Sequence, residues 1–582
     1  MTADHHARPV RIANCSGFFG DRLSAAREMV DPAVLMTSPI DVLTGDWLAE
    51  LTMLILHRQR ARNSDLGYAG TFLTQMEQVL GTCLDHGIKV VTNAGGLNPR
   101  GCASKVRQIA DRLGLHVNVA HIEGDDLLPR IEALRPQLQH LDSCEPFTAD
   151  AITANAYLGG WGIAAALTAG ADVVVCPRVT DASLVVGPAA WWHRWRRDDW
   201  DALAGAVVAG HVIECGAQAT GGNYTWFDEI PDLSRPPGFP IAEVAADGSA
   251  VITKHPGTGG TVNLGTVTAQ LLYEIGGEAY ANPDVIAHFD SISLAAIGPD
   301  RVQISDTRGS PAPAATKVCI NIDGGFRNRF TFVVTGLRQH EKAAWVVDAL
   351  FARLGGRDRF AEVDVRFVEA PSDGRTQEAS SGRVHVVVKS RDERLVGRTF
   401  SAAAVELALA NYPGFFSTGS PADAQSYGVY WPALVANEEV TQVVVHADGR
   451  RESIAASPAG RQRVRDELST DAALPTGPRS GQPLGDHFAA RSGDKGGNAN
   501  VGVWARDDPG YAWLAQYLTP DAVAVLLPEV GRLEVRRTLL ANLRAVNFVI
   551  VGYLGDGVAA STAFDPQAKG LGEYLLSRNW PG

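Results

Sequence analysis

Short runs of β-branched apolar residues, each followed by a polar or glycine-rich turn, constrain the fold of this sequence most. One run, Asp172-Val-Val-Val-Cys-Pro177, leads into Arg178-Val-Thr-Asp-Ala-Ser183. A Trp-rich helical segment follows and ends in His211-Val-Ile-Glu-Cys-Gly-Ala-Gln-Ala-Thr-Gly-Gly222. In α/β proteins, ligands bind beyond the carboxyl ends of the strands. We therefore expect the active site within residues 171–226.

The same alternation occurs throughout the first two hundred residues. Apolar runs that fit short strands occur at 10–14, 88–92, 117–120 and 173–176. Helical periodicity lies between them at 66–85, from about 100, around 128 and at 155–169. Strands and helices that alternate at this spacing are typical of a mostly parallel, doubly wound sheet. The predicted fold class is α/β.

Composition divides the rest of the chain. Glycine and proline dominate residues 231–260, where periodicity lapses, and a second set of strand and helix patterns runs from 261 to about 456. Residues 457–485 are polar and rich in Pro, Gly, Arg and Ser, as in exposed linkers. We expect an α/β region over 1–456 with parts at about 1–230 and 261–456, a linker over 457–485, and a small α+β domain over 486–582.

Composition and charge exclude several classes of protein. The 582 residues are 45% hydrophobic and 20% charged, which indicates a soluble globular protein. The net charge of -13 opposes nonspecific binding to nucleic acid or anionic membranes. The 7 cysteines include no CxxC pair, so they fit a reducing cytoplasm better than a disulfide framework. Residues 1–9 lack the apolar core of a signal peptide, and no apolar run has membrane-spanning length. We expect a cytoplasmic protein with neither nucleic acid nor membrane as a partner.

Glycine pairs are the most numerous ligand signal. They occur at Gly95-Gly96, Gly221-Gly222 and Gly259-Gly260, and Asn98 lies beside the first. Such pairs let backbone N–H groups approach an anion closely, although tight turns explain them equally well. None fits GxGxxG or GxxxxGK[ST], so a nucleotide-binding loop is not indicated. If these loops and Asn98 bind substrate, we expect at least two of the three loops to line one cleft.

His211 and Glu214 are the strongest candidates for acid/base chemistry. They lie three residues apart, so on a helix they share a face and suit either an acid/base pair or two metal ligands. Asp181 follows a predicted strand three residues after Arg178, whose guanidinium suits a carboxylate or phosphate. A helix-terminal His with a surface Glu, and an N-cap at Asp181, are the structural alternatives.

The catalytic interpretation gives each group a role. His211 is the base, Glu214 orients it, and Asp181 is the alternative carboxylate. The oxyanion donors are the N–H groups of Gly95, Gly96, Gly221 and Gly222. Cys15, Cys102, Cys176 and Cys215 also lie near glycine-rich turns, but free cysteines are commonly buried apolar residues.

A charged, glycine-rich loop stands out in the last domain. It carries Arg491, Ser492, Asp494 and Lys495. Alternating charges on such a loop suit an anionic ligand or an interdomain contact, and a solvated turn is equally plausible.

These motifs together resemble the acyclic terpene utilisation (AtuA-like) family over nearly the whole chain. The resemblance is carried by Asn14-Cys-Ser-Gly-Phe-Phe-Gly-Asp-Arg22, Thr92-Asn-Ala-Gly-Gly-Leu-Asn-Pro99, Gly210-His-Val-Ile-Glu-Cys-Gly-Ala-Gln-Ala-Thr-Gly-Gly222, Lys254-His-Pro-Gly-Thr-Gly-Gly260, Arg491-Ser-Gly-Asp-Lys-Gly496 and Asn542-Leu-Arg-Ala-Val-Asn-Phe548. The resemblance implies a large α/β region, a small C-terminal ferredoxin-like domain, and catabolism of acyclic terpenes or other branched acids through CoA thioesters.

The resemblance and the acid/base residues together predict an enzyme. We expect lyase or hydratase chemistry on a branched acyl-CoA or related carboxylate, with CoA as part of the substrate. No separate cofactor is predicted, the metal requirement is open, and a homo-oligomer is expected. The alternatives are a noncatalytic accessory subunit of an acyl-CoA catabolic complex and a cysteine- or metal-dependent hydrolase.

Overall fold

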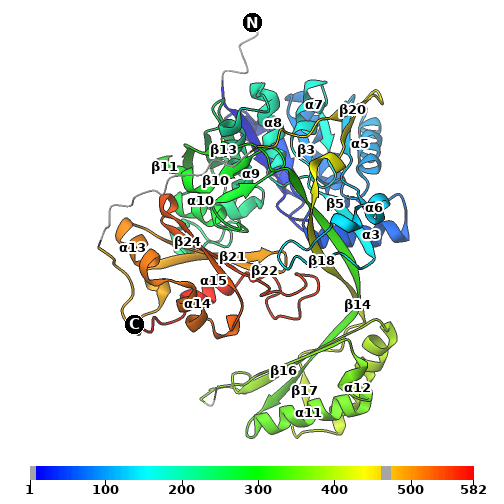
Figure 1. Cartoon of the computed structure of the whole chain (residues 1–582), viewed down its shortest axis with the longest axis vertical. Coiled ribbons are helices and arrows are strands. Elements are labelled where there is room, and N and C mark those ends of the chain that lie inside the picture. The colour runs from blue at the N-terminus through cyan, green and yellow to red at the C-terminus, as the bar shows by residue number, and fades with distance from the viewer. Residues whose placement is uncertain (1–7, 372, 461–473) are drawn as a thin grey trace. The chain divides into compact units, whose positions relative to one another are not determined.

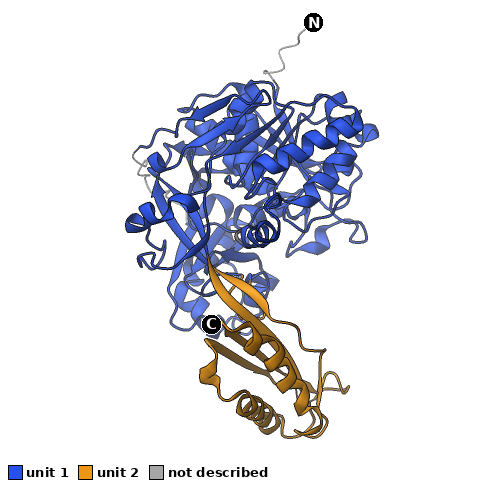
Figure 2. Ribbon diagram, turned by 90° about the vertical axis from the view of Figure 1, so that its right-hand side faces the viewer, with its two compact units in different colours: residues 1–321, 430–558, 567–582 blue, residues 322–429, 559–566 orange. Residues whose placement is uncertain are grey.

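The structure is a computed structural model that describes residues 8–371, 373–460 and 474–582 (Figure 1). The chain forms two compact units (Figure 2): residues 1–321, 430–558 and 567–582, and residues 322–429 and 559–566. Two sequence-based expectations concern residues outside the described ranges, namely the absence of a signal peptide at 1–7 and the middle of the predicted linker at 461–473. The predicted domain boundaries stay a prediction.

A large mixed sheet forms the centre of the first unit. In the described part of the chain it has eleven strands in the order β11-β12-β8-β7-β1-β2-β3-β6-β4-β19-β20. The central strands are parallel: β1 (Val10–Asn14), β2 (Val42–Gly45), β3 (Lys89–Thr92), β6 (Val173–Val175) and β4 (Val119–Glu123). Their mostly buried, apolar runs are what strands covered on both faces require. The predicted α/β fold class is confirmed.

Antiparallel strands extend this sheet at both edges. They are β7 (Pro240–Val244), β8 (Ala250–Lys254), β12 (Arg301–Ser305) and β11 (Ser293–Gly298) beyond β1, and β19 (Gln442–Val445) and β20 (Arg451–Ile454) beyond β4. The lapse of periodicity predicted over 231–260 was wrong in its second half, because β7 and β8 form a hairpin there. Its turn contains Asp247-Gly248, with Gly248 at a φ of 85°.

Helices cover both faces of the sheet in the first unit. They are α1 (Ala25–Met29), α2 (Pro32–Leu35), α3 (Glu50–Arg62), α4 (Gly70–Asp85), α5 (Pro99–Leu113), α6 (Ile131–Leu134), α7 (Trp161–Thr168), α8 (Ser183–His193), α9 (Trp200–Ile213) and α10 (Leu264–Leu271). The helices α4 and α5 share one apolar core with Val173, whereas α7, α8 and α9 share another with its neighbour Val174. Because adjacent strand residues point to opposite faces, the sheet is doubly wound.

The predicted helix at 155–169 was wrong at its start. Strand β5 (Ala151–Ala156) occupies the first residues, and α7 begins only at Trp161. The buried side chain of Asn155 donates to Asp125 Oδ2 at 2.7 Å. This hydrogen bond helps to hold the segment in the strand conformation. Gly159 and Gly160 then separate the strand from the helix.

A small sheet and a pair of long strands lie outside the large sheet. The sheet contains β9 (Ala279–Ala281), β10 (Ile286–His288) and β13 (Arg308–Ser310). Strand β14 (Ala315–Thr335) starts in the first unit and ends in the second, and β18 (Gln425–Ala436), which pairs with it, returns.

The second unit has an antiparallel sheet covered by helices. Besides β14, its strands are β15 (Glu362–Val368), β16 (Ser381–Ser390) and β17 (Phe416–Ser417), and its helices are α11 (Gln339–Leu354) and α12 (Phe400–Glu406). Phe332, Val386, Leu350 and Phe400 share its apolar core.

The C-terminal part of the first unit is a four-stranded antiparallel sheet in the order β21-β22-β24-β23. Its strands are β21 (Phe488–Lys495), β22 (Asn498–Ala505), β24 (Ala545–Ile550) and β23 (Val535–Leu540), and its helices are α13 (Asp508–Tyr517), α14 (Pro520–Leu526) and α15 (Leu571–Leu576). The predicted ferredoxin-like α+β fold is confirmed. Its helix-covered face has a core of its own, while Trp504 and Ala545 join the core of the large sheet.

No helix within the three described ranges is long and apolar enough to cross a membrane.

Candidate active site

Ionisable and polar side chains gather at the carboxyl ends of the central parallel strands. Asp46 follows β2, Asn93 follows β3, and Arg178 and Asp181 follow β6. Glu214 directly follows the last residue of α9. The parallel strands place their carboxyl ends at one edge, which is why residues distant in sequence meet there.

Asp46 is a buried carboxyl held by two hydrogen bonds. Asn93 Nδ2 donates to Asp46 Oδ1 at 2.5 Å, and the Leu48 N–H donates to the same oxygen at 3.0 Å. Burial raises the pKa of Asp46 well above its ordinary value, and the nearby Asp181 carboxylate raises this pKa further. Sequence reasoning missed Asp46, although its position just after Val42-Leu43-Thr-Gly45 was an available signal.

Arg178 and Asp181 form the ion pair that their spacing allowed. Arg178 Nη1 donates to Asp181 Oδ1 at 2.5 Å and to Leu48 O at 3.1 Å. The guanidinium carbon lies 4.2 Å from the ring centroid of Tyr157. Arg178 is only 3% exposed, whereas the Asp181 side chain is 29% exposed. Arg178 is thus a buried residue that forms an ion pair with the more exposed Asp181.

His211 and Glu214 are brought together, with protonation states that burial controls. His211 Nδ1 lies 3.4 Å from Glu214 Oε1, and the two side chains are 1% and 7% exposed. Burial lowers the pKa of His211 to about 4, helped by the charge of Lys495. Burial raises the pKa of Glu214 well above its ordinary value, and Asp181 and Glu274 raise it further. These shifts favour a neutral His211, the form that the predicted base requires, beside a protonated Glu214.

Tyr280 on β9 completes the cluster from outside the predicted stretch. Its ring centroid lies 5.1 Å from that of His211, and Lys495 Nζ lies 5.4 Å from the Tyr280 centroid. Burial raises the pKa of Tyr280 well above its ordinary value, with further contributions from Glu214 and Asp181. The tyrosine therefore keeps its hydroxyl proton. Nothing in the pattern around Glu274 or Tyr280 marked them in the sequence.

The glycine N–H groups proposed as oxyanion donors already have protein acceptors. The donor–acceptor pairs are Gly95 to Cys176 O at 3.1 Å, Gly96 to Asn93 O at 3.2 Å, Gly221 to Gln218 O at 3.3 Å and Gly222 to Ala217 O at 3.0 Å. These bonds hold the loops in shape, so the oxyanion donor is better sought among side chains. Asn98 is the N-cap of α5, because its Oδ1 accepts from the Gly101 N–H at 2.9 Å.

Two of the three glycine loops touch each other. A Cβ on Gly260, whose φ is 77°, would lie 2.2 Å from Thr220 O. The Thr261 N–H also donates to that oxygen at 2.9 Å. This close approach requires Gly260 and brings its loop, with Gly259, against the loop of Gly221 and Gly222. That two of these loops line one ligand cleft stays a prediction.

The cysteines near the glycine turns are poor nucleophiles in this structure. Burial raises the pKa of the Cys15, Cys102 and Cys176 thiols, and it raises that of Cys215 with help from Glu214. Over the described ranges, no group of three or more His, Cys, Asp or Glu residues is arranged to hold a metal ion.

A cavity of about 180 Å³ lies between the loop at 223–227 and the C-terminal domain. Its lining includes Arg491 and Lys569. Both residues interact electrostatically with Cys215, the neighbour of Glu214 in sequence. Through these two side chains the cavity is linked electrostatically to Cys215.

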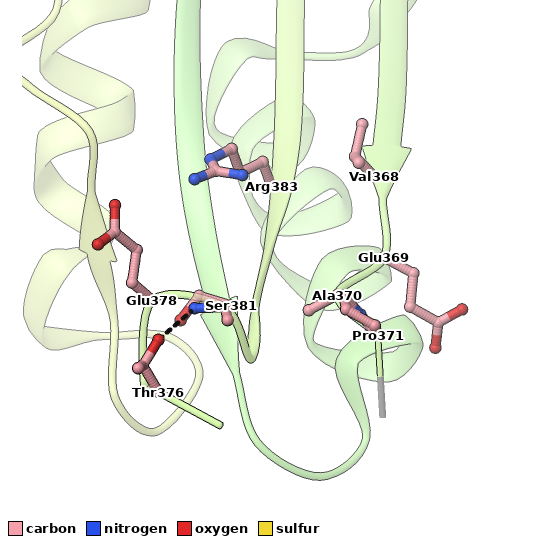
Figure 3. A pocket seen from close by; sticks show the side chains of 9 residues that line it. Val368, Glu369, Ala370, Pro371, Thr376, Glu378, Ser381 and Arg383 are labelled. Atoms are coloured by element: carbon pink, nitrogen blue, oxygen red, sulfur yellow. Dashed lines mark hydrogen bonds between the residues drawn. The ribbon is translucent and has the colours of Figure 1, made fainter. Parts of the chain in front are cut away.

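A larger and more open hollow, of about 370 Å³, lies in the second unit (Figure 3). It is lined by the segment after β15 and the start of β16, including Glu369, Glu378 and Arg383, which are exposed. Ser381 is its buried polar residue, and its Oγ donates to Gln377 O at 2.7 Å. This hollow has no buried charge, so the cluster in the first unit is the stronger candidate.

Fold and site together define a mixed α/β protein in which a ferredoxin-like domain borders a cluster of buried acids at the strand ends of a large sheet. The chain belongs to the acyclic terpene utilisation family: residues 10–446 match the family protein AtuA, and residues 483–581 match the AtuA ferredoxin-like domain. The resemblance expected from the sequence is confirmed, and it indicates a part in acyclic terpene utilisation. Among proteins with curated descriptions, none matches this sequence significantly.

Proposed function

We propose that the chain catalyses a lyase or hydratase step on a branched acyl thioester or related carboxylate, with Glu214 as the proton-transfer group. The supporting observation is the burial of Glu214 among other acids, which raises its pKa well above the ordinary value. Carboxyl groups with strongly perturbed pKa values cluster at active sites, where burial gives neighbouring acids different protonation states.

The chemistry needs a base, an acid and a donor to the developing oxyanion. Asp181, in its ion pair with Arg178, is a carboxylate suited to accept the proton α to the thioester carbonyl. Protonated Glu214 is suited to donate a proton to the leaving hydroxyl. Tyr280, whose raised pKa keeps its hydroxyl protonated, is suited to donate a hydrogen bond to the carbonyl oxygen. In this scheme His211 packs against Glu214 and Tyr280 and positions them.

A screen of the purified protein against CoA thioesters and hydroxy acids, with mass spectrometry of the products, tests this proposal. Once a substrate is found, Glu214→Gln should lower turnover by about 10² to 10⁴, the usual contribution of a general acid or base. Glu77→Gln, an exposed glutamate paired with Arg112 on the surface of the first unit, is the matched control and should keep wild-type turnover.

Two results would contradict the proposal. Conversion by Glu214→Gln at the wild-type rate, with circular dichroism confirming its fold, would remove Glu214 from the mechanism. Absence of conversion across the whole panel, together with thioester binding, would favour the noncatalytic accessory role.

A further inference from the structure

One edge of the large sheet in the first unit is a strand without charged residues. Strand β11 is the last strand at this edge (Figure 1), and its sequence is Ser293-Leu-Ala-Ala-Ile-Gly298. Within the described residues, it pairs with β12 on one side and with no strand on the other. Five of its six residues are exposed, among them Ile297 at 49%. The outward N–H and C=O groups of β11 are therefore open to pairing with another strand.

The two faces of β11 have different surroundings. Leu294 packs against the apolar core of the large sheet. Because side chains alternate along a strand, Ser293 and Ala295 point to the opposite face. Their partners on β12 are Ser305 and Gln303. The outer face at this edge of the sheet is thus built from small or uncharged side chains.

Three other edge strands carry charged side chains. Strand β20 lies at the opposite edge of the same sheet, β15 at an edge of the sheet in the second unit, and β23 at an edge of the C-terminal sheet. Their charged residues are Arg451 and Glu452 on β20, Glu362, Asp364 and Arg366 on β15, and Arg536 and Arg537 on β23. Charged residues on an edge strand oppose its pairing with a strand of another chain. Strand β11 lacks this protection.

An irregularity in β11 leaves most of the strand regular. The pairing with β12 shifts register between Ala296 and Gly298. Such bulges bend an edge strand and can end pairing. This shift lies at the end of β11 next to the turn into β12, and residues 293–296 keep regular partners on β12. The regular stretch can therefore accept a strand along its outer edge.

We propose that β11 pairs antiparallel with β11 of a second copy of this chain, so that two large sheets join across a two-fold axis. An antiparallel strand pair is symmetric, so the same edge serves both copies and the assembly closes as a dimer. The chain's net charge of -13 makes two copies repel each other overall, and β11 adds no charge to that repulsion. Pairing also covers exposed apolar surface of Ile297. This dimer does not depend on the function proposed above.

Sedimentation velocity on the full-length protein tests the assembly. Wild type should be a dimer at micromolar concentration. Ala295→Lys places two like charges near the two-fold axis, so it should raise the Kd of the dimer by about 10-fold or more. Ile297→Lys, a second variant on the same strand, should weaken the dimer as well. Ala352→Lys adds the same charge at an exposed position of α11 in the second unit and should leave the Kd unchanged.

Hydrogen–deuterium exchange locates the interface. The outward amides of residues 293–298 should exchange slowly in the wild-type dimer and faster in Ala295→Lys, with circular dichroism confirming that the variant is folded. A wild-type protein that is monomeric at micromolar concentration would overturn the proposal. Assembly that persists unchanged in both lysine variants of β11, as a dimer or a larger oligomer, would also overturn it, because the interface would then lie on another surface.

Discussion

At the scale of single residues, burial sets the protonation states of the candidate site. The three-residue spacing of His211 and Glu214 predicts that they meet, and they do. Which of them carries the proton depends on desolvation and on Asp181 and Glu274, which come from other parts of the chain. A sequence pattern has no access to that balance, so the pKa shifts of the two groups emerge only from the structure.

The pH dependence of stability checks the protonated state of Glu214. Its pKa in the folded protein is raised above the ordinary value of 4.5, so the folded state holds a proton that the unfolded chain releases. The stabilisation from this proton is fully present below about pH 4.5 and is lost as the pH rises through the pKa of Glu214 in the folded protein. Glu214→Gln, which mimics the neutral acid, should therefore become more stable relative to wild type as the pH rises from 5 to 9.

Urea denaturation at several pH values measures this difference. Each pH unit contributes about 1.4 kcal/mol at most, because one proton is involved. The difference in stability between the Glu77→Gln control and wild type should not shift in favour of the variant as the pH rises. A constant difference between wild type and Glu214→Gln would show that Glu214 is ionised in the folded protein.

At the scale of elements, periodicity predicted the strands and helices of the buried centre well. Strands β1, β3 and β6 and helix α4 match their predicted segments, because continuous apolar runs and a 3.6-residue period are strong signals. The hairpin of β7 and β8 was missed, since short strands in a Gly- and Pro-rich region carry little pattern. The last two residues of strand β5 were assigned to the following helix, because the strand pairs with β14, more than a hundred residues away in sequence.

The packing of β22 against the end of α10 depends on one buried amide pair. Asn500 Nδ2 donates to Asn547 Oδ1 at 2.5 Å, and Asn500 Oδ1 accepts from the Glu274 N–H at 2.8 Å. The neighbouring Gly502 allows this approach, since a Cβ there would lie 2.5 Å from the Cβ of Leu272. These contacts also fix the backbone of Glu274, one of the acids around Glu214.

Asn500→Ala should destabilise the protein by about 1–3 kcal/mol, because it removes the acceptor of the Glu274 N–H and the donor to Asn547 Oδ1. Chemical denaturation measures the change. Asn579→Ala, an exposed position in the same domain, should change stability by less than about 0.5 kcal/mol. Equal stability of Asn500→Ala and wild type would mean that the amide pair does not hold these elements together.

At the scale of the whole molecule, the C-terminal domain is predicted as separate in sequence and yet forms part of the first unit. Asn542 Nδ2 donates to Phe289 O and to Ile292 O, both at 2.8 Å, and Arg506 donates to Glu229 at 2.5 Å. Trp504 lies in the core of the large sheet. Composition predicts a boundary along the chain, but it carries no information on the apolar face that the domain buries against its neighbour.

A linker-like segment along the chain together with buried contacts between the domains predicts that the protein stays assembled after the chain is cut. Residues 457–485 have the composition of an exposed linker, so limited proteolysis should cut there before it cuts elsewhere. Because the fragments share buried polar and apolar contacts, they should elute together on size exclusion and separate only in denaturant. Mass spectrometry locates the cut. Segment 260–317 serves as the comparison and should be cut later, because β11 and β12 within it are part of the large sheet. Earlier cleavage within 260–317 would move the boundary, and separation of the fragments under native conditions would show that these contacts are too weak to hold the domain at the site.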